Sequence, residues 1–153
     1  MTTTITIVTG GFDPLHTGHI AYFKAAKEFG NSVCVGVNSD EWLTRKKGRP
    51  FMPMSERMAI IKELKCVDFA IEFNDKDDSA CDAIKMALEV FDKVVFCNGG
   101  DRGNSNTPEL DAFENDDRVE FKFGVGGTDK KNSSSWILKK LSLIHISEPT
   151  RPY

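Results

Sequence analysis

Two histidines, His16 and His19, stand three positions apart in the segment GGFDPLHTGH. Residues three apart on a helix share one side of it, so both imidazoles are expected on the same side of a first helical turn. Neutral imidazoles at a helix N-terminus can donate hydrogen bonds to a triphosphate as charge develops during attack on the α-phosphorus. The spacing therefore indicates phosphoryl-transfer chemistry. The alternatives are one capping and one packing histidine, or a zinc pair, although no third zinc ligand is evident.

The residues around the histidines suit an anion. Glycines allow the backbone to approach a ligand closely, and a helix beginning near residue 17 would offer free amides and the positive end of its dipole. Asp13 is expected to fix the loop through backbone bonds, or to hold Mg²⁺ through a water molecule; no direct metal ligand is predicted. The loop residues expected to bind a nucleotide are Gly10, Gly11, Phe12, Asp13 and Gly18.

Strand and helix patterns alternate along the chain and would position this motif. β-Branched or continuous apolar runs predict strands at 4–8, 32–38, 68–73, 93–98 and 118–123. Apolar spacing and start signals predict helices at 17–29, 55–65, 79–91, from 107 onward, and at 133–140. This alternation predicts one doubly wound, Rossmann-like α/β domain with a mainly parallel five-stranded sheet, in which ligands bind where the strand order reverses. The loops at 10–17, 38–53, 98–106 and 124–133 would then form the site.

Composition narrows the class of protein. A formal net charge of −3 argues against a general nucleic-acid binder. No signal peptide or membrane-length apolar run is present, so a cytoplasmic protein is expected. The four cysteines contain no Cys-x-x-Cys pair and are expected to be buried, reduced thiols. The domain is predicted to span 1–140, because 141–153 reads like the translation of a sequencing adapter and is interpreted as a non-native tail.

The histidine segment resembles the His-x-Gly-His signature of the cytidylyltransferase-like nucleotidyltransferase family. Further resemblances follow in family order: 38–41 with 45–50 and 55–57, the Gly-Gly-Asp turn at 98–101, and the serine run at 133–135. The resemblance implies an enzyme that transfers a nucleoside monophosphate from ATP or CTP to a phosphorylated small molecule, with Mg²⁺, releasing pyrophosphate. It favours sugar-phosphate members such as heptose-1-phosphate adenylyltransferases. Glycerol-3-phosphate cytidylyltransferases are the runner-up, because they carry an arginine where this chain has Thr128.

The resemblance also implies roles for particular residues. Lys46 or Lys47, on a basic loop, would neutralise the α- or β-phosphate beside His16 and His19, with help from Arg49 or Arg57; a solvated basic loop is the alternative. The remaining nucleotide contacts would come from Asn98, Gly99, Asp101, Ser133, Ser134 and Ser135, where a plain helix cap would also explain a serine. The acceptor would be bound by Asp40, Arg57 and Arg102.

Two broader alternatives accompany this interpretation. A nucleotide-binding sensor could keep the pocket without turnover, although the intact histidines and lysines count against it. A class I aminoacyl-tRNA synthetase uses a His-x-Gly-His motif in the same way, but 153 residues leave no room for a tRNA-binding domain. Family members of this size tend to be dimers, so a homodimer is a prediction from the resemblance alone.

Overall fold

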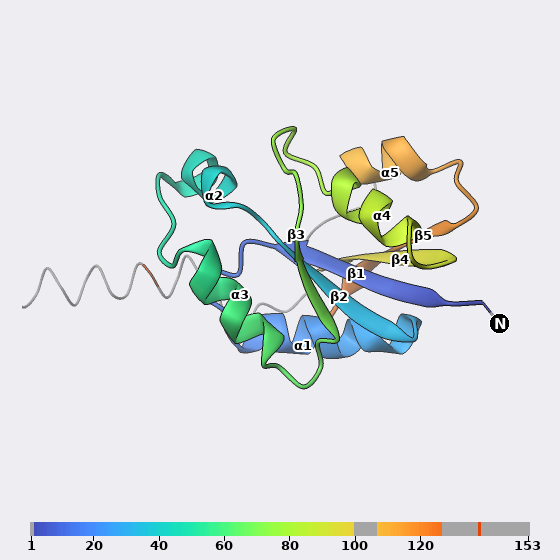
Figure 1. Ribbon diagram of the computed structural model, residues 1–153, viewed down its shortest axis with the longest axis horizontal. Helices are drawn as coiled ribbons and strands as arrows, with labels where there is room; N and C mark the ends of the chain where they lie inside the picture. The colour runs from blue at the N-terminus through green and yellow to red at the C-terminus, as the bar shows by residue number, and fades with distance from the viewer. Residues whose placement is uncertain (1, 100–106, 127–137, 139–153) are drawn as a thin grey trace, which may run out of the picture.

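The computed structural model describes residues 2–99, 107–126 and 138 (Figure 1). Its sheet is wholly parallel and has the strand order β3-β2-β1-β4-β5. The predicted doubly wound, five-stranded α/β fold is confirmed. The strands are β1 (Thr4–Gly10), β2 (Ser32–Val37), β3 (Phe69–Glu72), β4 (Lys93–Gly99) and β5 (Val119–Val125).

Helices cover both faces of the sheet, which explains why its central strands are apolar throughout. The helices α1 and α3 pack on one face, and α4 and α5 on the other (Figure 1). A single 3₁₀ turn, Lys27–Phe29, continues α1. The α-helices are α1 (Thr17–Ala26), α2 (Asp40–Lys47), α3 (Met54–Lys62), α4 (Cys81–Leu88) and α5 (Pro108–Phe113).

The strand order reverses at β1. The chain runs from β1 outward through β2 to the edge strand β3, and then returns to the other side of β1 to form β4. The helices that follow β1 and β4 along the chain, α1 and α5, therefore lie on opposite faces of the sheet, and it is at such a reversal of strand order that sheets of this kind bind ligands. The helix α2 lies beyond this end of the sheet (Figure 1).

Several local predictions were wrong. Residues 40–47 form α2, although 38–53 was predicted to be a loop. The helix predicted at 55–65 spans Met54–Lys62, with Pro53 as its N-cap. The helix predicted at 79–91 spans only Cys81–Leu88, and the Asp82 carboxylate in its first turn accepts a hydrogen bond from the backbone N–H of Asn74, 2.8 Å away. The Pro108 start signal of α5 is confirmed.

The prediction that all four cysteines are buried is correct for two of them. Burial raises the pKa of Cys34 and Cys97 to about 12, so these thiols stay protonated and inert. Cys66 and Cys81 are only half-buried, although all four thiols are unpaired. Within the described ranges, no helix is long and apolar enough to cross a membrane. Apart from Leu138, the predicted helix at 133–140 and the predicted tail at 141–153 lie outside the described residues.

Candidate active site

The two histidine rings lie together at the start of α1. Their centroids are 3.8 Å apart and their planes differ by 28°, so the rings stack on one side of the helix, as predicted. They also cap the helix reciprocally. The backbone N–H of Gly18 donates to Nδ1 of His16, and the backbone N–H of His16 donates to Nδ1 of His19, each over 3.1 Å. The capping alternative is therefore realised by both rings at once, and it fixes their orientation.

This capping arrangement determines where the imidazole protons are. Because Nδ1 of both His16 and His19 accepts an N–H group, the single proton of each neutral ring lies on Nε2. Burial lowers the pKa of His19 to about 3, with a further contribution from neighbouring His16, and burial also lowers the pKa of His16. Both residues are only half-buried, so neither ring is sealed inside the core. At neutral pH the pair is uncharged, with an Nε2–H donor on each ring.

The same contacts correct one expectation about the helix start. Free backbone amides were expected to face the ligand, but the amides of His16 and Gly18 are already used by the two rings. Gly18 contributes to the site as a capped backbone position within the first turn of α1.

The glycine loop is shaped by protein neighbours. A Cβ atom at Gly10 would lie 3.0 Å from the Phe12 ring, and one at Gly11 would lie 2.8 Å from Cδ2 of Leu43 in α2. Phe12, predicted to bind the nucleotide, is only 4% exposed, and its backbone has a left-handed φ of 52°. Its ring packs edge-on against His19, with 4.9 Å between centroids. Phe12 thus supports the histidine ring from the core.

Of the two roles predicted for Asp13, the structure supports the one in which its carboxylate fixes the loop through backbone hydrogen bonds. Its side chain is fully buried, and its carboxylate accepts hydrogen bonds from the backbone N–H groups of Phe51 and Met52 over 2.6 and 2.7 Å. This arrangement ties the glycine loop to the segment that precedes α3. A carboxylate with no exposed surface does not fit a Mg²⁺ ion held through water. The described part of the chain also contains no cluster of three potential metal ligands.

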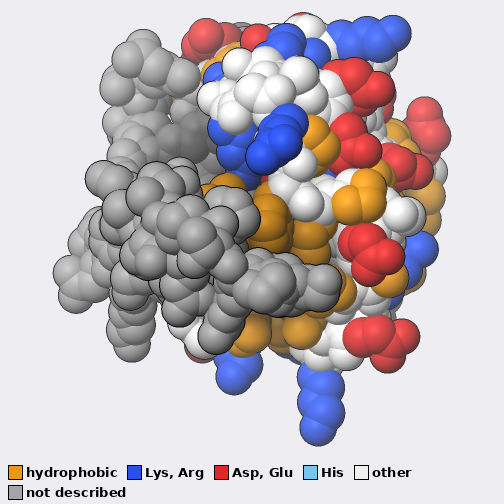
Figure 2. Space-filling model, turned by 90° about the vertical axis from the view of Figure 1, so that its left-hand side faces the viewer, with side chains coloured by type: hydrophobic (Ala, Val, Ile, Leu, Met, Phe, Trp, Pro, Cys, Tyr) orange, Lys and Arg blue, Asp and Glu red, His pale blue; other side chains and the backbone are white. Residues whose placement is uncertain are grey.

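The two candidate lysines point to different places. The ammonium group of Lys47 donates to the backbone carbonyl of Asp13 over 2.6 Å, while Nζ of Lys46 lies 5.6 Å from the centre of the Trp42 ring. Both come from the last turn of α2, and not from the predicted basic loop. Lys47 is therefore the one beside the histidine loop. Figure 2, which views this end of the molecule, shows basic side chains gathered above hydrophobic ones.

Arg57, predicted to bind the acceptor, is part of the scaffold. Its side chain is fully buried, and it donates to the backbone carbonyls of Gly11, Asn38 and Met52. It also donates to the carboxylate of Asp40, whose side chain is 39% exposed. Because its nitrogens already serve four protein oxygens, Arg57 joins the ends of β1 and β2 to α2. The acceptor contact proposed for Asp40 stays a prediction.

The end of β4 supplies one further candidate. Asn98 is 3% exposed, and its Nδ2 has no hydrogen-bond acceptor among the described residues, which is costly for a buried donor. Gly99 ends the strand beside it. Their predicted nucleotide contacts stay predictions. Asp101, Arg102, Ser133, Ser134 and Ser135 lie outside the described residues.

Two residues around α2 were missed from the sequence. Ser39 is the N-cap of α2, and its hydroxyl accepts from the backbone N–H of Trp42 over 3.0 Å. Asp75 holds Ser39 in turn. The first could have been found, because a serine before two acidic residues, with basic residues and Gly48 at the far end, is a complete helix signature. Nothing in the sequence around Asp75 signals its contact.

The chain is similar to known proteins in sequence and in fold. The cytidylyltransferase-like family pattern matches residues 7–80. The chain is 32% identical to "Bifunctional protein HldE" of Geobacter metallireducens over 138 residues, which is 88% of the chain. It is also 32% identical to the protein of that name from Geotalea uraniireducens, over 94% of the chain. The chain spans 27% and 28% of these two relatives.

The match to one solved structure extends over nearly the whole of that structure's chain. The lipopolysaccharide core biosynthesis protein from Thermoplasma volcanium is 30% identical, with a TM-score of 0.63 over 80% of this chain and 96% of its own. The NadR protein in complex with NR shares the fold, with a TM-score of 0.56 at 17% identity. The chain belongs to the cytidylyltransferase-like family of nucleotidyltransferase enzymes.

Proposed function

We propose that the chain transfers a nucleoside monophosphate from ATP or CTP to a sugar phosphate and releases pyrophosphate. The observation that carries the proposal is the pair of neutral imidazoles at the start of α1, held by reciprocal capping that uses Nδ1 of each ring and not the Nε2–H groups. Lys47 lies at the same loop and supplies a positive charge. Two neutral donors and one cation match the needs of a triphosphate at its reacting phosphorus.

The reaction asks the protein mainly for position and charge. The acceptor phosphate oxygen attacks the α-phosphorus, the bond from that phosphorus to the bridging oxygen breaks, and pyrophosphate leaves with the electron pair. Hydrogen bonds from Nε2–H of His16 and His19 would stabilise the charge that develops on the phosphate oxygens. Because capping fixes the rings before the nucleotide binds, little reorganisation is needed at the moment of reaction.

The sugar-phosphate acceptor is supported by the relatives. The structural relative at 30% identity is named for the biosynthesis of a saccharide, the lipopolysaccharide core. The HldE proteins match over most of this chain but extend well beyond it. Mg²⁺ would enter with the triphosphate, since the described residues do not fit a site of their own for it.

Acceptor-dependent release of pyrophosphate tests the proposal. The purified protein is incubated with Mg²⁺, either ATP or CTP, and a panel of sugar phosphates and polyol phosphates, with an acceptor-free control. We expect release of pyrophosphate with one nucleotide and at least one sugar phosphate. Nucleotide binding without release for any acceptor would instead identify a sensor. Thermal unfolding with ATP or CTP gives the base preference, because a bound ligand raises the melting temperature by mass action.

A further inference from the structure

The loop between β3 and α4 holds the helix that carries Lys47. Asp75 in this loop is 3% exposed, and all its side-chain hydrogen bonds run to the residues just before α2. One carboxylate oxygen accepts from Nδ2 of Asn38 over 3.0 Å and from the backbone N–H of Ser39 over 2.7 Å. The other accepts from the Ser39 hydroxyl, also over 2.7 Å. These contacts join segments 36 residues apart in sequence.

The contact continues into the helix through Ser39. Because the Ser39 hydroxyl donates to Asp75, its oxygen is oriented to accept the backbone N–H of Trp42 and so to cap α2. Burial raises the pKa of the Asp75 carboxyl, but the hydrogen bonds from Ser39 and Asn38 outweigh it, and the pKa lies below its ordinary value. Asp75 is therefore ionised at neutral pH, and its bonds to Ser39 are charge-assisted.

Helix α2 transmits its position to the histidine loop directly. A Cβ atom at Gly11 would lie 2.8 Å from Cδ2 of Leu43 and 3.4 Å from the Trp42 ring, so α2 packs directly on the glycine loop. At the other end of the helix, Lys47 contacts Asp13. A shift at the start of α2 would therefore change both the packing on the glycine loop and the place of the lysine ammonium group.

We propose that Asp75 is a positioning residue that acts through Ser39 and α2 to set the ammonium group of Lys47 beside the paired histidines. The proposal rests on the proposed function, because it assigns Lys47 a place in the reaction. Asp75 touches no reacting group itself. Its effect comes from holding a cation within reach of the phosphates, where a displacement of about 1 Å can cost as much as a hundredfold in rate.

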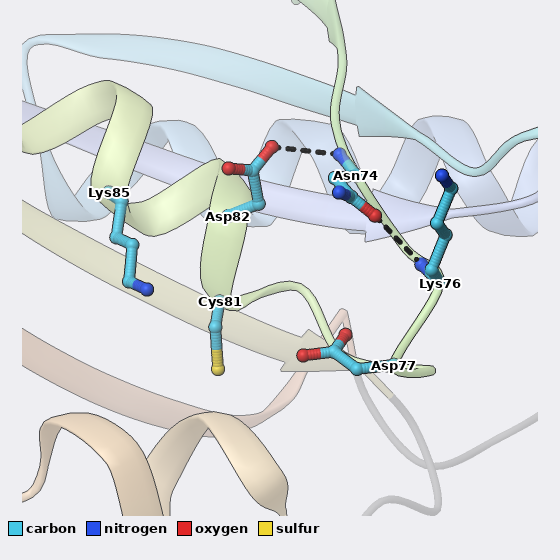
Figure 3. Close-up of a pocket in the computed structure, with 6 residues that line it drawn as sticks. All are labelled: Asn74, Lys76, Asp77, Cys81, Asp82 and Lys85. Atoms are coloured by element: carbon cyan, nitrogen blue, oxygen red, sulfur yellow. Dashed lines mark hydrogen bonds between the residues drawn. The ribbon is translucent and has the colours of Figure 1, made fainter.

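The same loop offers a matched control. Asp77, two positions away, accepts hydrogen bonds from the backbone N–H and the hydroxyl of Ser79 in its own loop, and among the described residues no hydrogen bond joins its side chain to α2. It lines a cavity of about 260 Å³ with Asn74, Lys76, Cys81, Asp82 and Lys85. Figure 3 shows that these side chains do not converge on one point. Asp77→Asn therefore makes the same charge change in the same loop without touching α2.

The first test measures the chemical reactivity of the Lys47 amine and does not depend on enzyme turnover. Amine labelling compares the rate at Lys47 with that at the exposed Lys46 in the same molecule. In Asp75→Asn and in Ser39→Ala we expect Lys47 to react several-fold faster relative to Lys46, and the backbone amide of Trp42 to exchange faster. Ser39→Thr, which keeps the hydroxyl, and Asp77→Asn should match the wild type. An unchanged Lys47 rate in both disrupting variants would overturn the proposal, whatever the enzyme's activity.

The second test is a double-mutant cycle on turnover. Asp75→Asn should lower kcat by about tenfold to a hundredfold, with a much smaller change in KM for the nucleotide. In the Lys47→Ala background it should cost less than about twofold more, because the group through which it acts is gone. Equal losses in both backgrounds would contradict action through Lys47. If the wild type releases no pyrophosphate with any acceptor, the proposed function fails, and the labelling result alone decides the role of Asp75.

Discussion

Replacement of His16 by asparagine and by alanine separates the two functions of its ring. The Nδ1 atom of His16 accepts the Gly18 N–H over 3.1 Å, and the Nε2–H is the group proposed to act on the triphosphate. Asparagine places an oxygen near the position of Nδ1 and is among the best N-cap residues, but it has nothing in place of Nε2. Alanine removes both groups.

The two variants should therefore differ in stability and agree in activity. Loss of the cap in His16→Ala costs about 1 kcal/mol of unfolding free energy relative to His16→Asn. Loss of one transition-state donor lowers kcat by about a hundredfold or more in both variants, which is about 2.7 kcal/mol on the barrier. Loss of the stacking contact with His19 is common to both, so the comparison cancels it.

Urea unfolding gives the stability difference, and acceptor-dependent pyrophosphate release gives the rate. Wild-type kcat in a folded His16→Asn protein would show that the ring serves only as a cap. Equal unfolding free energies for the asparagine and alanine variants would show that the Gly18 contact contributes little.

Three further predictions test the surroundings of the site. In the unfolded chain His19 binds a proton below about pH 6.5, whereas in the folded protein it binds one only below about pH 3. The free energy of unfolding therefore falls as the pH falls through this window. Between about pH 7 and about pH 5.5 the wild type should lose about 1 kcal/mol more in urea unfolding than His19→Asn, and equal losses would refute the neutral, half-buried ring. Arg57→Met leaves three backbone carbonyls and Asp40 without their donor, and should lower the unfolding free energy by about 3 kcal/mol or more; a loss below about 1 kcal/mol would contradict the scaffold role. Gly11→Ala places a methyl group 2.8 Å from Leu43 and should cost about 1–3 kcal/mol, part of which Leu43→Val restores; no recovery would mean that the strain lies elsewhere.

The architecture of the sheet could be predicted from the sequence because each strand is marked by a local pattern of apolar residues. Continuous apolar strands such as 32–37 are buried on both faces, and the glycine-rich turn after β1 falls where the strand order reverses. The histidine spacing also predicted correctly that the two rings lie on one side, although His16 is the N-cap of α1 and it is the reciprocal capping bonds that bring the rings together.

The roles of the other polar residues depended on contacts that no local pattern contains. Arg57 has the charge and place of an acceptor ligand, yet tertiary contacts bury it among backbone carbonyls. Asp13 was open to two roles, and only its contacts with Phe51 and Met52 decide between them. The distinction between Lys46 and Lys47 likewise required the orientation of α2, since adjacent residues on a helix point about 100° apart.

The state of the two imidazoles can be measured directly with ¹H–¹⁵N correlation spectra of the histidine rings near pH 7, recorded without and with Mg²⁺ and the preferred nucleotide. Both His16 and His19 should be neutral, with the proton on Nε2. The Nε2 signals should shift when the nucleotide binds, whereas the Nδ1 signals should keep the chemical shifts of nitrogens that accept a backbone hydrogen bond. Rings that carry a positive charge, hold their proton on Nδ1, or do not respond to nucleotide would contradict the mechanism.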